Sequence, residues 1–297
     1  MTPAYVQRLR CPRCEARLAF DGTLRGAELD TGTLRCRGCG VAWPVHRGLP
    51  DLVDGLEIRG FERLIRQVYD LIAPFHDLAV RYVLPLAMFC SEEEGRARYV
   101  RRLELEQLHA DRGERVNILD VGIGGGGNLP VIARCLSDDV EAEIWGVDFS
   151  ANMLAQCVRR CRHWKGPPVH LLLGDAHRLP FPDASFDRVL HVGGIATYRD
   201  PRRALAEMAR VARPDTPIVV VDEQLDPAAA RSWYQWLTFK AMTLYELSPH
   251  APVEHLPPDA YDVRVEQASS FFYCLSFRVP RSVRERAAAA GPEVRQP

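Results

Sequence analysis

The chain has 297 residues, of which 47% are hydrophobic, and its 38 basic and 39 acidic residues leave a formal net charge of −1. This length exceeds one average domain, and the apolar content is ample for a folded core. A charge so close to zero gives no overall attraction for a polynucleotide, so a nucleic-acid partner is not expected. The longest apolar run, Val83 to Cys90, is too short to cross a bilayer, and we expect a cytoplasmic protein.

Four of the nine cysteines form two C-x-x-C pairs near the N-terminus, Cys11 with Cys14 and Cys36 with Cys39. An odd total of cysteines argues against a disulfide framework, and a redox-active site needs only one pair, placed at a helix start. Two thiolate pairs on tight turns can close a soft tetrahedral site, which is typical of zinc or iron. We predict a structural zinc ion in a ribbon domain over residues 1–55. That domain alone is expected to unfold when the metal is lost, leaving cofactor binding intact.

Residues 56–114 are predicted to form a helical lead-in, or cap, before a larger domain. Apolar residues recur at helical spacing over 57–81, where Pro74 divides or kinks the pattern. Residues 92–109 have the pattern of a charged amphipathic helix, which we expect on the solvated outer layer of the fold.

A strand followed by a glycine loop organises the rest of the chain. Val116–Val121 has the pattern of a buried parallel strand and runs directly into five glycines, with a G-x-G-x-G spacing at Gly122, Gly124 and Gly126. Helical spacing over 129–136 places this loop at a helix N-terminus, where free backbone amides can face a negative group.

Four more short apolar runs follow, each closed by polar or glycine residues and separated by helical patterns. The runs are 144–148, 169–173, 188–192 and 217–221, and helices are expected over 151–161 and 201–211. Asp148 closes the first run 22 residues after Gly126, where an α/β nucleotide-binding fold places the carboxylate that accepts ribose hydroxyls. Polar residues at successive strand ends predict a ligand site at the carboxyl edge of the sheet.

The last part of the domain combines an aromatic segment with two more strands. Residues 262–266 and 271–279 predict a terminal antiparallel pair. The fold class is therefore α/β, a doubly wound, Rossmann-like, mostly parallel seven-stranded sheet over residues 115–280, followed by a tail over 281–297. Residues 226–247 are rich in large rings, which either form an apolar substrate pocket or lid or bury one another. These rings are Trp233, Tyr234, Trp236, Phe239 and Tyr245.

Three of these stretches resemble the motifs of a known family. They are Asp120–Gly126 (DVGIGGG), Gly146–Leu154 (GVDFSANML) and Gly174–Asp187 (GDAHRLPFPDASFD). In this order they are similar to class I S-adenosylmethionine-dependent methyltransferases, in particular the ubiquinone/menaquinone C-methyltransferase-like (methyltransferase type 11) group. A dinucleotide-dependent dehydrogenase is the alternative, but its fingerprint has a glycine where Leu129 stands.

The resemblance implies S-adenosylmethionine as cofactor, S-adenosylhomocysteine as product, and a set of residues around them. In this family the glycine loop lines the amino-acid and ribose end, Asp148 binds the ribose hydroxyls, and Asp175 with Ala176 meets the adenine. The implied cofactor contacts are Asp120, Gly122, Gly124, Gly126, Asn128, Asp148, Phe149, Met153, Gly174, Asp175, Ala176 and His191.

Two residues are candidates for a catalytic role. His191 ends the fourth apolar run, where it is a general base, a cofactor contact or a buried structural histidine. Tyr69 belongs to a Tyr-Asp pair that resembles one lying near the cofactor in quinone-type methyltransferases, and a core position is its alternative.

The implied activity is methyl transfer to a small, largely apolar or aromatic acceptor. Residues 9–14 and 43–53 also resemble the small zinc-ribbon protein that activates tRNA, rRNA and protein methyltransferases. The alternatives are therefore an RNA base methyltransferase that uses the ribbon for recognition, and a non-catalytic cofactor-binding scaffold. The histidine and tryptophan-lysine signature of the quinone enzymes is not recognisable over 77–94, so quinone itself is not predicted. The oligomeric state stays open, with a homodimer as one option.

Overall fold

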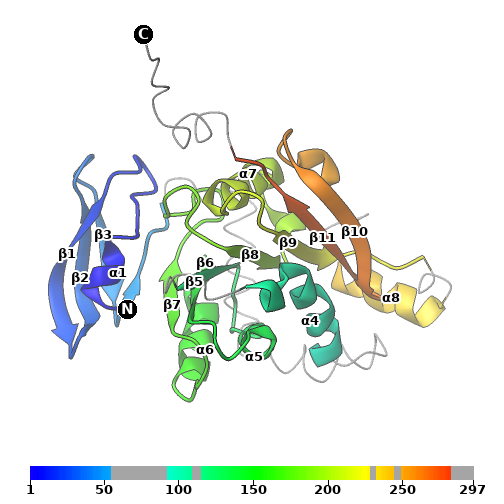
Figure 1. Ribbon diagram of the computed structural model, residues 1–297, viewed down its shortest axis with the longest axis horizontal. Helices are drawn as coiled ribbons and strands as arrows, with labels where there is room; N and C mark the ends of the chain where they lie inside the picture. The colour runs from blue at the N-terminus through cyan, green and yellow to red at the C-terminus, as the bar shows by residue number, and fades with distance from the viewer. Residues whose placement is uncertain (55–91, 109–114, 228–231, 244–248, 282–297) are drawn as a thin grey trace, which may run out of the picture.

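The structure is a computed structural model, and it describes residues 1–54, 92–108, 115–227, 232–243 and 249–281. Two sheets organise these residues, a four-stranded sheet near the N-terminus and a seven-stranded sheet in the order β10-β11-β9-β8-β5-β6-β7 (Figure 1). The helix predicted over 57–81, including Tyr69, lies outside the described residues, as does the tail after Arg281.

The large sheet confirms the predicted fold class. Strands β5 to β9 are parallel, and β11 runs antiparallel between β9 and β10. All six residues of β5 are buried, because both faces of this central strand are covered. The strands are β5 (Val116–Val121), β6 (Ala142–Asp148), β7 (Val169–Leu173), β8 (Arg188–Val192), β9 (Ile218–Glu223), β10 (Tyr261–Ser269) and β11 (Phe272–Arg278).

Two helices that flank the sheet, α6 (Ala151–Cys161) and α7 (Pro201–Val211), begin at polar caps and bury apolar side chains. The Ser150 hydroxyl accepts a hydrogen bond from the Met153 amide, and the Asp200 carboxylate accepts one from the Arg203 amide, as expected at helix N-termini. The longer helices are α4 (Glu92–Val100), α5 (Leu129–Cys135), α6 (Ala151–Cys161), α7 (Pro201–Val211) and α8 (Trp233–Met242). The short 3₁₀ turns are η2 (Arg101–Leu103), η3 (Leu105–Gln107), η4 (Ile195–Thr197) and η6 (Val253–His255).

Residues 92–108 correct one expectation. They do not form one long solvated helix, because α4 ends at Val100 and the two 3₁₀ turns follow. Tyr99, Val100, Leu103 and Leu105 are buried in the same apolar cluster as α5 and α6. The charged residues dominate the sequence pattern, but enough apolar side chains point inward for the segment to pack on the sheet.

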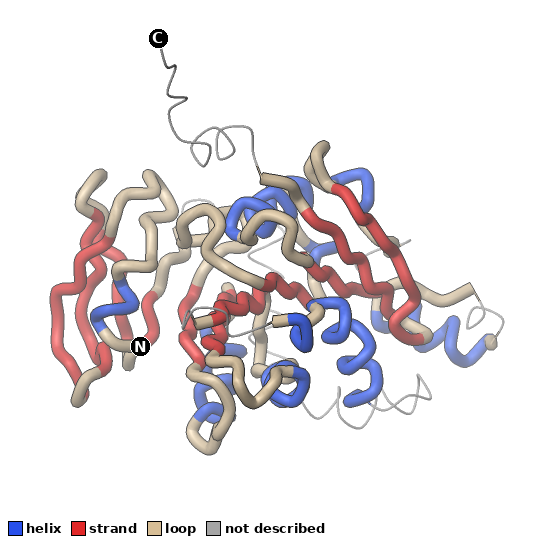
Figure 2. Tube along the Cα trace, in the orientation of Figure 1, coloured by secondary structure: helices blue, strands red, loops and turns tan. Residues whose placement is uncertain are grey.

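The N-terminal residues fold as a β-ribbon with one short helix, as the colouring by secondary structure shows (Figure 2). All its strands are antiparallel to their neighbours. Its elements are α1 (Pro3–Val6), β1 (Leu18–Arg25), β2 (Glu28–Cys36), β3 (Ala42–His46) and β4 (Leu49–Pro50).

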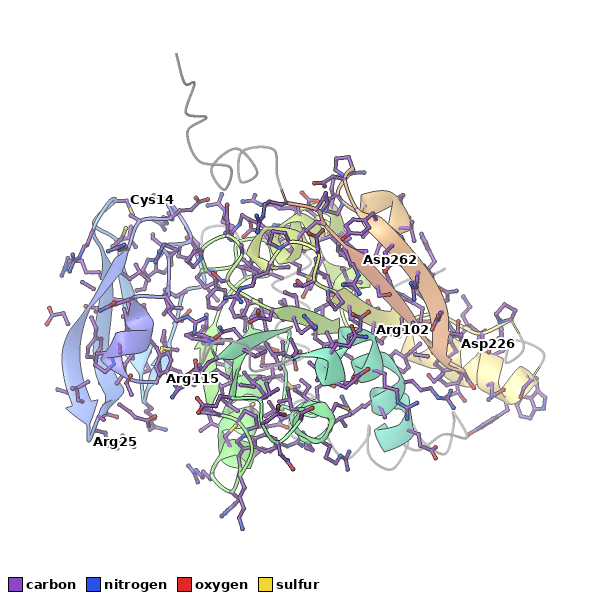
Figure 3. The ribbon with its side chains drawn as sticks, viewed as in Figure 1. Cys14, Arg25, Arg102, Arg115, Asp226 and Asp262 are labelled. Carbon is purple, nitrogen blue, oxygen red and sulfur yellow. The ribbon has the colours of Figure 1, made fainter. Side chains whose placement is uncertain are left out.

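The ribbon is docked on the β7 edge of the large sheet. The Leu52 amide donates to the Leu173 carbonyl at 2.9 Å, which continues the sheet past its last strand. The Tyr5 hydroxyl donates to Glu143 Oε1 at 2.7 Å, and the Arg115 guanidinium donates to the same oxygen at 2.7 Å. Figure 3 shows Arg115 where the ribbon faces the large sheet.

The ribbon stands where an α/β fold ordinarily has a crossover helix. Residues 174–187, which connect β7 to β8, form turns and loops only. One face of the sheet is covered by α4, α5 and α6. The other face shares a single apolar core with α7 and with Val6, Leu9 and Leu52 of the ribbon. This shared core does not fit the expectation that the ribbon unfolds alone when its metal is lost.

Candidate active site

The glycine loop after β5 adopts a conformation that only glycine reaches without strain. The φ angles are 72° at Gly122, 54° at Gly124 and 77° at Gly126. A Cβ on Gly126 would lie 2.8 Å from the Cys157 sulfur and 2.9 Å from Leu129 Cδ1, so this glycine also allows the loop to approach the helices. The loop therefore turns tightly at the carboxyl edge of the sheet, where Gly122, Gly124 and Gly127 stay partly accessible.

Asp148, at the end of β6, lies beside this loop. Its Oδ2 accepts a hydrogen bond from the Gly124 amide at 2.8 Å, and its Oδ1 accepts one from the Ser150 amide at 2.8 Å. The carboxylate thus joins the glycine loop to the loop that follows β6.

A cleft that is open to solvent lies between these loops. Its wall combines six of the predicted contact residues with residues that the sequence did not single out. The cleft is lined by Val121, Gly122, Val147, Asp148, Phe149, Gly174, Asp175, Ala176, His177, Thr197, Tyr198 and Arg199. Of the predicted set, Gly122, Asp148, Phe149, Gly174, Asp175 and Ala176 are therefore at the wall.

Asp175 is held as an ionised carboxylate within this wall. Burial alone raises the pKa of such a group, but the hydrogen bond from His177 Nδ1 and the Arg199 guanidinium bring the Asp175 pKa well below its usual range. The Oδ1 to His177 Nδ1 distance is 2.6 Å, and the Oδ2 to Arg199 Nη2 distance is 2.9 Å. A fixed negative charge at this point can accept a hydrogen bond from an amine.

The other predicted contacts lie behind the glycine loop. Met153 Cε would be 3.0 Å from a Cβ on Gly124, so this side chain supports the loop. Asn128 and Asp120 are buried beneath the loop and hydrogen-bonded to each other. These residues support the glycine loop from beneath and are not among the residues that line the cleft.

His191 is fully buried under Gly122. Its Nδ1 lies 2.8 Å from the Val121 carbonyl oxygen, and burial lowers its pKa, so the ring is neutral with Nδ1 as the donor. The other nitrogen, Nε2, has no hydrogen-bond partner among the described residues. Its role as a base stays a prediction, and Tyr69 lies outside the described residues.

The sequence missed Thr197, Tyr198 and Arg199, which reach the cleft from the turn after β8. The Asp222 carboxylate fixes this turn by accepting hydrogen bonds from the Gly194 amide at 3.0 Å and the Ala196 amide at 2.9 Å. The sequence feature that could have predicted these residues is the Gly-Gly pair directly after β8. Such a pair indicates a tight turn at the edge of the sheet.

The four predicted metal ligands come together at one end of the ribbon. The sulfur atoms of Cys11, Cys14, Cys36 and Cys39 all lie within 4.8 Å of one another. The Cys11 and Cys39 sulfurs are 3.7 Å apart, and those of Cys14 and Cys36 are 3.4 Å apart. Tetrahedral zinc with bonds of about 2.3 Å places neighbouring sulfurs about 3.8 Å apart, so the donor set fits the metal. Cys14 is labelled in Figure 3.

Comparison with known proteins agrees with this geometry. Residues 118–215 match the family described as "Methyltransferase domain". A demethylmenaquinone methyltransferase of Beutenbergia cavernae is 33% identical over 204 residues, which cover 67% of this chain and 75% of that protein. The chain belongs to the class I S-adenosylmethionine-dependent methyltransferases. A second demethylmenaquinone methyltransferase, of Renibacterium salmoninarum, is 34% identical over 52% of this chain and 58% of its own length.

Other methyltransferase relatives match shorter segments. A phosphatidylethanolamine N-methyltransferase of Cereibacter sphaeroides is 36% identical over 112 residues, which cover 37% of this chain and 51% of that protein. Among solved structures, Haemonchus contortus phosphoethanolamine N-methyltransferase 2 with S-adenosyl-L-methionine has a TM-score of 0.51 at 14% identity, covering 81% of this chain and 64% of that one. The [4+2]-cyclase SpnF has a TM-score of 0.50 at 17% identity, covering 73% and 95%. These structures share the fold of this methyltransferase.

Among the described residues of this methyltransferase, no helix is both long enough and apolar enough to cross a bilayer.

Proposed function

We propose that this methyltransferase acts on a small, largely apolar acceptor that enters beside α8. The observation that carries the proposal is the apolar surface of this helix. Trp233 is 77% exposed and Trp236 47% exposed, and Tyr234 and Leu237 are exposed beside them. For the aromatic residues of this segment the alternative was that they bury one another; of these, Phe239 is buried and packs against Phe271.

The position of α8 is consistent with a role in acceptor binding. It follows β9 at the carboxyl edge of the parallel strands, which is the edge that carries the cleft. Figure 1 shows α8 at the end of β10 and β11 that lies beside the carboxyl end of β9. Exposed tryptophans concentrated at one site ordinarily mark a binding surface. The relatives named demethylmenaquinone methyltransferase support an apolar acceptor, and the net charge of −1 does not favour a polynucleotide.

The site residues have corresponding proposed roles. S-adenosylmethionine supplies an activated methyl group, so the protein has to bind, align and exclude water. In this proposal Asp148 accepts the ribose hydroxyls and Asp175 accepts the adenine amine, while the glycine loop faces the amino-acid end. Tyr198 and Arg199 close the cleft over the cofactor. His191 Nε2 is available as an acceptor beneath the loop.

The acceptor proposal is tested by methyl transfer from radiolabelled S-adenosylmethionine to three probes. The probes are a hydroxynaphthoquinol in detergent, phosphatidylethanolamine vesicles and total tRNA with rRNA fragments. Labelling of the quinol or the lipid supports an apolar acceptor. Labelling of RNA, with binding that weakens steeply with salt, would establish the RNA alternative instead. Labelling of none of the probes, with cofactor bound, would favour the scaffold alternative.

A matched pair of variants then tests the role of α8. Trp236→Ala should raise KM or lower kcat for the acceptor and leave cofactor affinity intact. Tyr261→Ala is the control, because Tyr261 is 41% exposed at the opposite end of β10. Equal effects of the two substitutions would count against α8 as the acceptor surface.

We further propose that the four cysteines hold one structural zinc ion. The amides of Gly38 and Cys39 lie 3.3 and 3.4 Å from the Cys36 sulfur and can donate to a thiolate there. Four protein ligands leave no open coordination position, so the metal would stabilise the ribbon and take no part in the reaction. Elemental analysis of the purified chain should give one zinc per protein.

A further inference from the structure

A buried hydrogen-bond network connects α4 to the strand before the glycine loop. Asn128 Oδ1 accepts two hydrogen bonds, from Arg96 Nη1 at 2.6 Å and from the Tyr99 hydroxyl at 2.7 Å. Asn128 Nδ2 donates to Asp120 Oδ2 at 3.1 Å. Because both donors from α4 require an oxygen, they fix the amide with its nitrogen toward Asp120.

Arg96 also lies flat against the glycine loop. A Cβ added to Gly127 would be 2.8 Å from Arg96 Nη2 and 2.9 Å from Arg96 Cζ. The glycine at this position thus provides room for the guanidinium. Unlike Gly126, Gly127 does not have a positive φ, so its backbone conformation is open to other residues.

Asp120 is the buried charge at the end of this network. It is fully buried two residues before Gly122, and its Oδ1 has no hydrogen-bond partner among the described residues. Burial raises the Asp120 pKa to about 7, while Asn128 and the Arg96 charge lower it. The charged or titratable groups that face it are Arg96 of α4, Asp148 of β6 and Cys157 of α6.

The position of α4 and the turn after it is itself fixed by residues of β8, β10 and β11. The Arg188 guanidinium donates to the Leu103 and Glu104 carbonyls, directly after α4. The Arg278 guanidinium donates to the Glu104 carboxylate at 2.5 Å, and Arg98 donates to the Ala268 carbonyl at 3.1 Å. These contacts hold Arg96 in place without involving the cleft.

We propose that Arg96 is a positioning residue for the amino-acid end of the cofactor. Through Asn128 it holds the Asp120 carboxylate at the base of the glycine loop, where the unpaired oxygen can accept the cofactor's ammonium group. Burial raises the Asp120 pKa, and the Arg96 charge lowers it, which favours the ionised carboxylate that an ammonium partner requires. This inference rests on the proposed cofactor arrangement. It adds Arg96, which belongs to a segment that the sequence pattern placed on the surface.

The test compares two probes that differ only at the amino-acid end. S-adenosylhomocysteine carries the ammonium group, and 5′-methylthioadenosine has the same nucleoside without it. Calorimetry with Arg96→Gln should show S-adenosylhomocysteine bound about tenfold more weakly at pH 7 and 5′-methylthioadenosine bound as in the wild type. A purely structural role of Arg96 would weaken both.

The pH profile provides a second readout. Wild-type affinity for S-adenosylhomocysteine should rise with pH as Asp120 ionises. Arg96→Gln should move this rise to higher pH, because Asp120 loses a cation that lowers its pKa. Arg96→Lys keeps the charge and should restore the wild-type profile. Gly127→Ala should reproduce the Arg96→Gln effect by displacing the guanidinium.

Different outcomes would overturn the proposed cofactor site and the proposed role of Arg96. Wild-type protein that binds neither probe would overturn the proposed cofactor site. Arg96→Gln protein that matches the wild type in affinity and pH profile would overturn the role of Arg96 alone.

Discussion

Asp148 and Gly124, which are 24 residues apart, are joined by a 2.8 Å hydrogen bond from the glycine amide to the carboxylate. Asp148, at the end of β6, therefore shapes the glycine loop that follows β5. In our proposal the same carboxylate accepts the ribose hydroxyls. Its substitution should then affect both the loop and the ligand.

Asp148→Ala should weaken S-adenosylhomocysteine binding by about 1.5–3 kcal/mol for each charge-assisted bond lost. Asp148→Asn keeps one oxygen and should have a smaller effect. Isothermal titration calorimetry measures both affinities, with Asp183→Ala, an exposed carboxylate outside the cleft, as the control. Wild-type affinity in Asp148→Ala would contradict the ribose assignment.

The double substitution Cys36→Ser and Cys39→Ser should abolish the bound zinc, measured by elemental analysis. Because the ribbon shares its core with the large sheet, thermal unfolding of the whole chain should move to lower temperature. If the cofactor-binding domain of this variant instead unfolds at the wild-type temperature, the ribbon folds independently of it.

Tyr5→Phe should destabilise the folded chain by about 2 kcal/mol, because it removes a hydrogen bond to the buried Glu143 carboxylate. Denaturant titration gives the free energy of unfolding. The control is Leu24→Ala, at an exposed position of the ribbon away from the sheet, where little change is expected. Equal stabilities for Tyr5→Phe and the wild type would show that this contact does not support docking.

His170 should make the fold sensitive to acid. Burial lowers its pKa to about 4, although Glu143, 3.7 Å away, raises it. The unfolded chain takes up this proton near its ordinary pKa of 6.5, so the free energy of unfolding should fall as the pH drops from 6.5 toward 4. Glu143, whose own pKa lies below its ordinary value, loses its stabilising charge at still lower pH.

His170→Phe should flatten this dependence while keeping the ring packing with Tyr5 and Trp145. Denaturant titrations at a series of pH values measure the slope, and His46→Gln on an exposed ribbon position is the control. A slope unchanged by His170→Phe would assign the acid sensitivity to other groups.

The sequence by itself determined the local elements of this methyltransferase. Strand ends such as Asp148, the helices over 151–161 and 201–211, and the glycine turn follow from hydrophobic period, capping and backbone conformation, which are short-range properties. The pairing of four cysteines into one cluster also follows from their spacing, because each C-x-x-C pair is a local turn.

Only the tertiary structure decided how separate segments meet. The role of Arg96 depends on which face of α4 packs against Asn128, and a charged sequence pattern does not contain that contact. The ribbon covers the β6–β7 face because residues 174–187 form no helix, so the exposed apolar strands take their cover from elsewhere in the chain. The tertiary structure alone therefore shows which distant segments bury one another and which buried charges they leave unpaired.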